Sequence, residues 1–533
     1  MTTIFDQERL LFEPKIPNNN AIKIIFCFPN NYNVGITSLG YQTVWASFAS
    51  RSDVNVSRLF TDINEPLPKK SEILGFSFSW ELDYVNIFDI LDTLNIPLQT
   101  SERNDDHPLV FGGGPTLTSN PEPFADFFDV ILLGDGEDLI NSFLEAYKVI
   151  RNESRAVKLS YLATIPGIYI PSLYEITYYD NDGEIKSIKA IEESIPSSIE
   201  KQIYRGDSLS TSTVVTEKAV WENIYMVEVV RSCPEMCRFC LVSYLNLPFR
   251  IADLNTSLIP NIEKGLKVTN RIGLLGPSIT QHPEFGNLLN YLNQPKYDDI
   301  RVSIASVRAN TVTEKLAKLL SSRKTKSITI AVESGSPKIR KNINKKLDND
   351  EIISAAINAK IGGLKNLKLY GMVGLPGENE EDIEQTISML DSIQKAAQGL
   401  KITFGCSTFV PKAHTPFQWL GVNKLSQKRL KFLEKVLGKR RIEFRPESYN
   451  WSIIQALISR GDRRLSKLFK LTRSYGNSLG SYKRAFKELK GEIPPLEYYA
   501  HNNWKTDQVL PWAHLKGPLS HASLLKQYNE TKF

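Results

Sequence analysis

The chain of 533 residues carries two series of strand-like segments that alternate with helix-like segments. The first series lies in residues 1 to about 150, where apolar runs such as "AIKIIFCF" end at Pro, Asn or Gly. Runs without polar alternation are typical of strands that are buried on both faces of a parallel sheet. We therefore expect an α/β protein that begins with a doubly wound parallel sheet over residues 1–150.

The second series begins at residue 225 and contains six strand-like segments. Helix-like segments such as "TEKLAKLLSS" and "DIEQTISMLDSIQKAA" separate these strands, so we expect a partial (β/α)6 barrel over 225–425. Residues 151–224 contain two β-rich runs around Asp-Gly, which predict a connector with a β-hairpin that lies across the next domain. Residues 426–533 are predicted to form a helical C-terminal domain.

Composition narrows the class of protein only slightly. Hydrophobic residues make up 41% of the chain and charged residues 23%, which is ordinary for a folded protein. The net charge of +6 is too small for this length to argue for nucleic acid. The first residues lack the apolar core of a leader, and no stretch reaches the roughly 18 apolar residues of a membrane span. We expect a cytoplasmic protein without a membrane partner.

Three of the five cysteines, Cys233, Cys237 and Cys240, stand within eight positions directly after the first strand of the second series. Thiolates with this spacing in one short loop can face a common centre. Structural zinc sites take four ligands and ferredoxin clusters take four cysteines, so three thiolates leave one position of a [4Fe–4S] cluster open. The alternative is a closed zinc site completed by His282 or another distant histidine. Cys406 is more simply explained by core packing.

This C-x3-C-x2-C loop, set on a β/α barrel and with Phe239 before its last cysteine, resembles the radical S-adenosylmethionine superfamily over about 225–420. The resemblance implies that the three cysteines are catalytic and hold a [4Fe–4S] cluster whose open iron binds S-adenosylmethionine. It implies reductive cleavage of that cofactor to a 5′-deoxyadenosyl radical, with electrons from a low-potential donor of the flavodoxin or ferredoxin type. It also assigns cofactor contacts to strand ends and to the aromatic of the loop: Phe239, Gly276, Ser278, Ser303, Arg308, Glu333, Gly374, Pro376 and Gly377.

For these glycines a tight turn is the competing explanation, and for Glu333 a structural ion pair. Arg308 is expected to pair with the carboxylate of the cofactor, and Glu333 to reach its ribose or amino group.

The first 150 residues add a second resemblance. "LVFGGGPTLTSNPEPFADFFDVILLGDGE", together with "PNNYNVGITSLGYQ" and "IPGIYIPS", is similar to the cobalamin-binding-type domain that precedes the barrel in one branch of the superfamily. Domains that supply a histidine to cobalt carry D-x-H-x-x-G, whereas this chain has Asn30, Tyr32 and Gly35, so no histidine of this loop would bind cobalt. A Rossmann-like fold without a corrin is an equal alternative. Three glycines are expected to lie against the nucleotide tail if cobalamin binds: Gly112, Gly113 and Gly114.

The leading hypothesis is a radical enzyme that abstracts hydrogen from an unknown substrate or, with cobalamin, methylates it. A second hypothesis is modification of tRNA or a ribosomal protein, suggested by nine basic residues between Lys424 and Arg445. A third is an iron–sulfur or zinc module without catalysis. Near the end of the chain, Trp512 and His514 are expected to dock the tail on the barrel.

Overall fold

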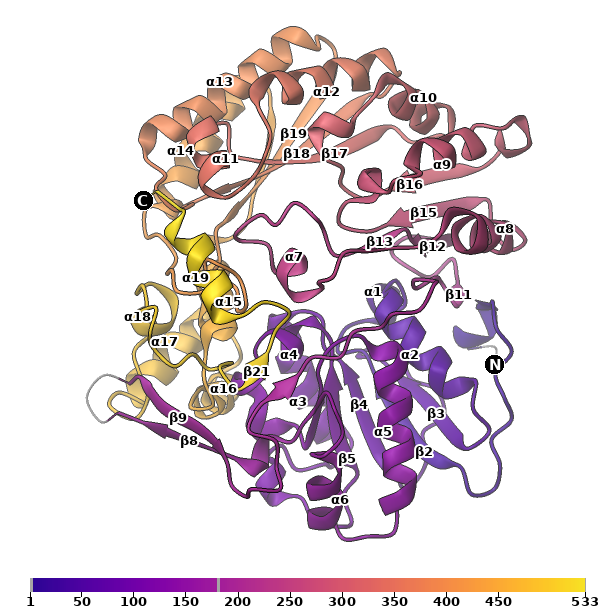
Figure 1. Cartoon of the computed structure of the whole chain (residues 1–533), viewed down its shortest axis with the longest axis vertical. Coiled ribbons are helices and arrows are strands. Elements are labelled where there is room, and N and C mark those ends of the chain that lie inside the picture. Colours follow the sequence, from indigo (N-terminus) through magenta and orange to yellow (C-terminus); the bar gives the residue numbers. More distant parts are fainter. Residues whose placement is uncertain (1–2, 180–182, 533) are drawn as a thin grey trace. The chain divides into compact units, whose positions relative to one another are not determined.

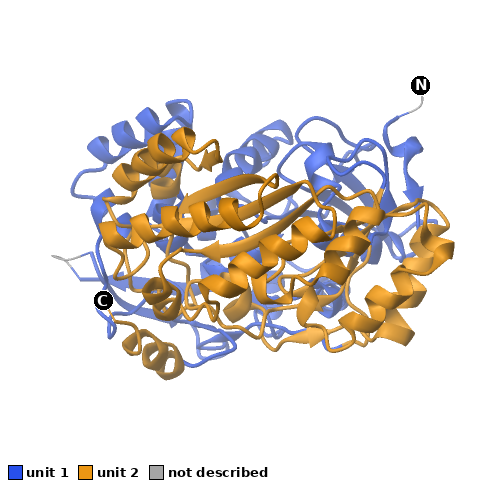
Figure 2. Cartoon of the chain, turned by 90° about the horizontal axis from the view of Figure 1, so that it is seen from above, with its two compact units in different colours: residues 1–205, 212–223, 455–520 blue, residues 206–211, 224–454, 521–533 orange. Residues whose placement is uncertain are grey.

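The structure is a computed structural model that describes residues 3–179 and 183–532 (Figure 1). The chain divides into two compact units, shown in different colours in Figure 2. Unit 1 comprises residues 1–205, 212–223 and 455–520, and unit 2 comprises residues 206–211, 224–454 and 521–533. The boundaries predicted at 150, 224 and 425 stay a prediction. No helix in the described part of the chain is long and apolar enough to cross a membrane.

Unit 1 is built on a six-stranded sheet in the order β3-β2-β4-β5-β6-β7, parallel except for the last pair. Its strands are β2 (Ile22–Cys27), β3 (Val54–Leu59), β4 (Ile73–Ser77), β5 (Leu109–Gly113), β6 (Val130–Leu132) and β7 (Ile168–Tyr169). The chain passes from β2 to β3 on one side and then to β4 on the other. The carboxyl ends of β2 and β4 therefore meet at a switch point, which is where open α/β sheets bind ligands.

Helices cover both faces of this sheet. On one face α2 (Leu39–Ala49) and α5 (Gly136–Ile150) lie side by side (Figure 1). Arg51, just after α2, forms an ion pair with Glu145 of α5 at 2.5 Å. Because β-helix-β crossovers are right-handed, the reversal of strand order puts α3 (Tyr84–Thr93) on the opposite face. The doubly wound sheet predicted from the apolar runs is confirmed. The weakly apolar edge strand β3 and the antiparallel β7 were not predicted.

Helices from the C-terminal part of the chain complete the second face of unit 1. Phe469 of α16 (Leu465–Ser474) stacks on Tyr84 of α3, with 4.5 Å between ring centroids, and on Phe124 at 5.6 Å. The remaining elements of unit 1 are short: β1 (Arg9–Leu10), α1 (Tyr32–Gly35), α4 (Pro115–Ser119), α6 (Arg155–Leu162), β8 (Tyr174–Tyr178), β9 (Ile185–Ala190), β10 (Ile199–Glu200), β11 (Val214–Val215), α17 (Leu479–Glu488), α18 (Leu496–Ala500) and β21 (Leu515–Lys516). Strands β8 and β9 form the predicted hairpin, although Asp182 of its Asp-Gly turn lies outside the described residues.

A fully buried carboxylate, Glu122, joins four segments of unit 1 that are far apart in the sequence. Its oxygens accept a hydrogen bond from the Tyr169 hydroxyl at 2.5 Å and lie 3.1 Å from Arg463 Nε. His514 Nε2 lies 3.4 Å from the same carboxylate, and its ring packs 4.9 Å from that of Tyr169. The expectation that His514 docks the tail on the barrel is wrong, because its partners are the buried groups of unit 1.

Charge holds this cluster together. Burial acts to raise the pKa of Glu122, but Arg463, His514 and Tyr169 outweigh it and lower the pKa to about 2. A carboxyl group whose pKa is lower in the folded than in the unfolded chain stabilises the fold above its unfolded value. That stabilisation is therefore present above about pH 4.5 and is lost as the pH falls towards 2.

We expect Glu122→Gln to lower the free energy of unfolding by about 3 kcal/mol at pH 7, because it leaves the partly buried Arg463 without its counter-charge. Denaturant unfolding measures the change. Glu492→Gln is the matched control, because its pair with Lys467 is exposed and its removal should cost less than about 0.5 kcal/mol. Equal effects of the two substitutions, or an unchanged loss of stability between pH 4.5 and 2 in Glu122→Gln, would contradict this account.

Unit 2 contains seven parallel strands that form the partial barrel. Two sheets, β12-β15-β16 and β17-β18-β19-β20, are joined by a parallel bridge between Val307 and Ile330. The strands are β12 (Ile224–Glu228), β15 (Arg271–Leu275), β16 (Arg301–Ile304), β17 (Ser327–Glu333), β18 (Asn366–Val373), β19 (Lys401–Thr408) and β20 (Glu443–Pro446). The six predicted strands are all present. The seventh, β20, falls in the region expected to be helical and pairs with β19.

Helices separate the strands of unit 2 and cover its barrel (Figure 1). They are α8 (Ile259–Leu266), α9 (Phe285–Leu292), α10 (Glu314–Ser322), α11 (Pro337–Asn342), α12 (Asn349–Ile361), α13 (Glu380–Ala396) and α14 (Ser426–Lys439). The helix α15 (Tyr449–Arg460) follows β20, and α19 (His521–Asn529) lies near the end of the chain. Side-chain caps set the starts of several of them; Asp348 and Glu351, for example, form a capping box on α12.

Candidate active site

The three clustered cysteines lie on one loop of unit 2, which we call the cysteine loop (residues 232–240). It runs from β13 (Val230–Arg231), just beyond the first barrel strand, to α7 (Leu241–Leu245) (Figure 1). The short strand β13 pairs with β14 (Arg250–Ile251) behind the loop. The loop thus stands at the carboxyl end of the first strand, the position at which barrel enzymes carry out their chemistry.

Burial and neighbouring charges set the pKa of two of the loop thiols. Burial, opposed by the Lys345 ammonium and aided by charge on Cys240 and Cys233, raises the pKa of Cys237 to about 12. Burial also raises the pKa of Cys240, on which Cys233 acts in the same direction. Buried thiols of this kind keep their protons at neutral pH, so a metal that binds them must displace those protons.

The donor set fits an iron–sulfur cluster with an open position. In residues 3–179 and 183–532, no three His, Cys, Asp or Glu side chains stand in the arrangement of a formed metal site. The loop nevertheless supplies three free thiols, and soft sulfur ligands of this kind suit iron–sulfur clusters. The other two cysteines, Cys27 and Cys406, are buried in strands β2 and β19.

His282, the histidine proposed to complete a zinc site, already contacts backbone groups through both ring nitrogens. Its Nε2 lies 2.8 Å from the Ala252 carbonyl oxygen, and its Nδ1 accepts a hydrogen bond from the Glu284 backbone N–H at 3.1 Å. One ring nitrogen therefore bonds the backbone beyond β14, and the other bonds the backbone of the loop after β15. This arrangement does not favour a closed zinc site that includes His282.

Side chains distant in the sequence hold the cysteine loop in shape. Asn344 Nδ2 donates to the Glu235 and Met236 carbonyl oxygens at 3.0 and 2.8 Å, and the Tyr244 hydroxyl donates to the same Met236 oxygen at 3.1 Å. The Arg238 backbone N–H donates to Ile343 O at 3.0 Å. Sequence reasoning missed these supports, since Asn344 stands about a hundred positions away and carries no motif of its own.

Two of the predicted cofactor-binding residues, Gly276 and Ser278, lie just beyond the second barrel strand. A β-carbon at Gly276, whose φ is +144°, would lie 2.6 Å from the Val230 carbonyl oxygen, so the close approach of β13 requires glycine there. Ser278 is buried and its hydroxyl donates to the Gln281 side chain. Ser303 lies within β16, in register with Gly273 of β15. Their roles in cofactor binding stay predictions.

Arg308 and Glu333 each have a protein partner in this structure. Arg308 Nη1 lies 3.1 Å from Glu235 Oε2 in the cysteine loop. Glu333 ends β17 with φ of +66°, and its Oε1 lies 3.1 Å from Lys345 Nζ. The structural ion pair considered for Glu333 is therefore present. Contact of either residue with the cofactor stays a prediction.

The fifth strand end and the loop aromatic pack into the barrel. The Gly374 N–H donates to Glu378 Oε2 at 2.6 Å, and Arg429 Nη1 donates to the same oxygen at 2.9 Å, which fixes the turn that contains Pro376 and Gly377. Phe239 packs on an apolar cluster formed by Ile339, Ile343, Leu375, Phe409, Phe417 and Leu420. Phe239 thus has a packing role, and its predicted role in cofactor binding stays a prediction.

In unit 1, Tyr32 stands at the sequence position of a cobalt-binding histidine, and its hydroxyl is bonded to another side chain of the protein. Its hydroxyl donates to Glu8 Oε1 at 2.6 Å, and Glu8 Oε2 lies 2.7 Å from Arg58 Nη2. Burial is the main cause that raises the pKa of Tyr32 far above its ordinary value. Tyr32 is therefore a buried, protonated support of the switch-point loop.

Close packing explains two of the three glycines at the end of β5. A β-carbon at Gly112 would lie 2.4 Å from Leu117, and one at Gly114 would lie 2.5 Å from the Phe78 carbonyl oxygen. At Gly113 the nearest atom would be 3.8 Å away, so only that position leaves free space. Contact of the three glycines with a nucleotide tail stays a prediction.

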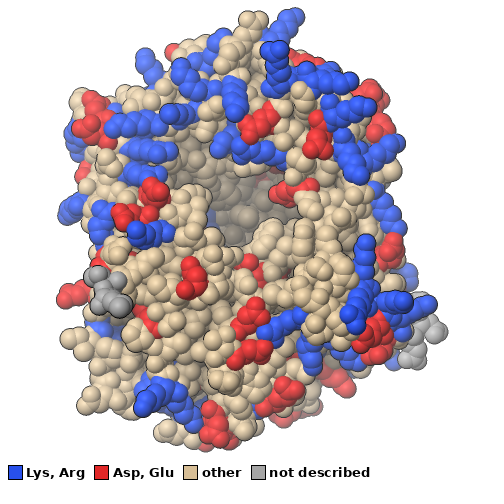
Figure 3. All heavy atoms as spheres, turned by 180° about the vertical axis from the view of Figure 1, so that it is seen from behind, with Lys and Arg blue, Asp and Glu red and all other residues tan. Residues whose placement is uncertain are grey.

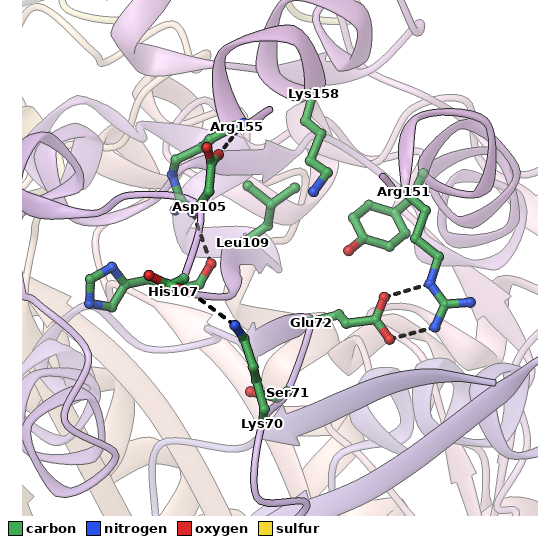
Figure 4. A pocket seen from close by; sticks show the side chains of 11 residues that line it. Lys70, Ser71, Glu72, Asp105, His107, Leu109, Arg151, Arg155 and Lys158 are labelled. Carbon is green, nitrogen blue, oxygen red and sulfur yellow. Dashed lines mark hydrogen bonds and ion pairs between the residues drawn. The ribbon is translucent and has the colours of Figure 1, made fainter. Parts of the chain in front are cut away.

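A cavity of about 100 Å³ lies at the opposite, amino ends of β4 and β5 (Figure 4). Its charged side chains are largely paired with one another: Arg151 with Glu72 at 2.6 Å, and Lys70 with Asp106 at 3.2 Å. Arg155 reaches Asp129 at 2.6 Å. These pairs bridge the sheet to α5 and α6, which is a structural role.

Several basic residues of the C-terminal run are paired with carboxylates. Arg429 is buried against Glu378, Arg440 lies 2.8 Å from Asp391, and Arg445 lies 2.5 Å from Glu443. In the upper half of the face shown in Figure 3, basic side chains predominate and a few acidic ones lie among them.

Two family models match the chain. Residues 42–171 match "Radical SAM proteins, N-terminal", and residues 227–390 match "Radical SAM superfamily". The chain belongs to the radical SAM superfamily. It is therefore a radical SAM enzyme, and membership implies the [4Fe–4S] cluster and S-adenosylmethionine that the cysteine loop predicted.

Two relatives and one solved structure show what the chain is similar to. An uncharacterized protein of Methanocaldococcus jannaschii is 28% identical over 465 residues, which cover 86% of this chain and 94% of that protein. A tRNA-2-methylthio-N(6)-dimethylallyladenosine synthase of Rickettsia typhi is 29% identical over 259 residues, 44% of this chain and 54% of the synthase. The radical S-adenosylmethionine methyltransferase TsrM from Kitasatospora setae, at 12% identity, has a TM-score of 0.51 and covers 75% of this chain and 77% of its own. That likeness supports the α/β fold.

We expect His282→Gln to leave the metal content per chain unchanged, because the backbone occupies both ring nitrogens. The substitution should lower the free energy of unfolding by about 1 kcal/mol through the lost hydrogen bonds. Metal analysis of the purified variant, beside wild type and Cys237→Ala, measures the difference. Loss of metal from His282→Gln to the level of Cys237→Ala would contradict the three-thiol site.

Proposed function

We propose that this enzyme cleaves S-adenosylmethionine reductively at a [4Fe–4S] cluster held by Cys233, Cys237 and Cys240. The radical then abstracts hydrogen from an unreactive carbon of a substrate, or a methyl group is transferred to that carbon. The observation that carries the proposal is the loop with three free cysteines at the carboxyl end of the first barrel strand. A low-potential donor of the flavodoxin or ferredoxin type would supply the electron.

When bound, the cluster and its cofactor supply one-electron cleavage of the sulfonium carbon–sulfur bond. The residues of this chain anchor, shape and shield the site. The three thiolates supply the protein ligands, and the apolar cluster around Phe239 keeps water from one side of the loop. Lys345, buried beside Cys237, adds a positive charge that favours the thiolate form.

Cobalamin is the cofactor that we propose for unit 1. The switch point between β2 and β4 supports a ligand site at the carboxyl ends of these strands. TsrM from Kitasatospora setae, whose fold is similar, has cobalamin and a [4Fe–4S] cluster bound in its solved structure. Because Tyr32 is bonded to Glu8, a corrin in unit 1 would receive no cobalt ligand from this loop.

Modification of tRNA is less well supported. The similarity to the synthase of Rickettsia typhi covers about half of that protein. A second cluster of three cysteines is excluded by the count of five, since only Cys27 and Cys406 remain.

We expect the protein, reconstituted without oxygen in the presence of iron, sulfide and a strong reductant, to convert S-adenosylmethionine to 5′-deoxyadenosine or S-adenosylhomocysteine. Chromatography with mass detection identifies the products. Alanine at Cys233, Cys237 or Cys240 should abolish both iron binding and product. Cys406→Ala is the matched control and should retain both, at a cost in unfolding free energy of about 1 kcal/mol. Iron retained in all three loop variants would refute the proposal.

We expect the chain purified with supplied cobalamin to bind about one corrin, and Tyr32→Phe to leave the absorption spectrum of the bound corrin unchanged, because Tyr32 is held by Glu8. The variant should be less stable by about 1 kcal/mol. A spectrum that shifts in Tyr32→Phe would identify Tyr32 as a cobalt ligand, and the absence of corrin would favour a Rossmann-like fold that has no cobalamin.

A further inference from the structure

Glu235, in the middle of the cysteine loop, directs its carboxylate to two neighbouring strand ends of the barrel. Its Oε2 lies 3.1 Å from Arg308 Nη1, beyond β16. Its Oε1 accepts a hydrogen bond from the Gln281 amide, beyond β15, and Gln281 in turn accepts one from Ser278. One side chain of the loop thus connects the first, second and third strand ends.

The backbone of the loop needs such support. Ser232 and Met236 have φ of +68° and +53°, in the left-handed region that L-residues other than glycine adopt at a cost in free energy. Conformations of this kind persist where the surroundings hold them. Asn344 holds the carbonyl oxygens of Glu235 and Met236 from one side. The Glu235 carboxylate provides the attachment on the barrel side.

The Arg308 guanidinium is held by Glu235 and by two further protein groups. Its Nη2 donates to the Lys346 carbonyl oxygen at 2.7 Å, and its Nε to Asn310 Oδ1 at 3.4 Å, so all three guanidinium nitrogens have protein partners. The side chains of Arg308 and Glu235 are only 8% and 14% exposed. If Arg308 turned to another carboxylate, Glu235 would be left nearly buried without its counter-charge, which is unfavourable.

We infer that Glu235 and Arg308 form a brace that holds the cysteine loop on the barrel, so that Arg308 is a positioning residue rather than a ligand of the cofactor carboxylate. The inference rests on the proposed function only in that the braced loop carries the cluster. The brace itself is a property of the protein without metal. Arg308 acts on the cluster through Glu235 and the loop backbone.

Hydrogen exchange of the metal-free full chain tests the brace directly. In Glu235→Gln and in Arg308→Gln the backbone amides of residues 232–240 should exchange at least about tenfold faster than in wild type. The double variant should exchange no faster than either single variant, because the two side chains act as one unit. Glu443→Gln, which removes a carboxylate bonded to Arg445 elsewhere in unit 2, is the control and should leave these amides unchanged.

The iron-loaded proteins supply a second measurement. Both single variants should bind iron but lose it to a chelator faster than wild type, and the electron paramagnetic resonance signal of the reduced cluster should shift alike in both. Their affinities for S-adenosylmethionine, measured by equilibrium binding, should change by the same factor. A much weaker affinity in Arg308→Gln alone would make Arg308 a cofactor ligand and overturn the inference. Wild-type exchange of the loop amides in Glu235→Gln would overturn it as well.

The two proposals fail in different ways. A wild-type chain that binds no iron would refute the proposed function, while the exchange measurement would still decide the brace. A wild-type chain that binds iron and cleaves its cofactor, with loop amides insensitive to Glu235, would leave the proposed function standing and refute the brace.

Discussion

Buried carboxylates that need a counter-charge hold the distant segments of this chain together. A carboxylate removed from water is strongly destabilising unless cations and hydrogen-bond donors surround it, so its position determines which segments must meet. In unit 1 Glu122 gathers Tyr169, Arg463 and His514. In unit 2 the ion pairs of Glu235 with Arg308, and of Glu333 with Lys345, surround the cysteine loop. The candidate site is thus shaped by charges that are satisfied within the protein.

The need of each buried charge for a counter-charge also applies to the charged residues at the barrel strand ends. Charged residues at strand ends suggest cofactor contacts, but in this structure Arg308 and Glu333 already have partners. The thiols differ, because burial raises the pKa of Cys237 and of Cys240, so a metal that binds them must displace their protons. The ion pairs of Glu235 and Glu333 contribute to the shape of the loop and its surroundings.

Unit 1 combines a ligand-binding topology with a loop that supplies no cobalt ligand. The reversal of strand order at β2 creates the crevice, and Tyr32 closes the loop beside it through Glu8 and Arg58. If cobalamin binds unit 1, this loop would supply no ligand to its cobalt.

Local patterns were sufficient to predict the doubly wound sheet and the six barrel strands, because burial on both faces is a property of neighbouring residues. Cysteine spacing likewise predicted a metal-binding loop, and that role stays a prediction. These patterns missed β3 and β7 at sheet edges, and β20 behind a basic helix, where the apolar signal is weak. They also assigned His514 to the barrel, whereas it packs with Glu122. The partners of Glu122, Glu235 and Glu333 were decided only by tertiary structure. A single charge has no periodicity in the sequence, and its counter-charge comes from a segment that the fold brings within a few ångströms.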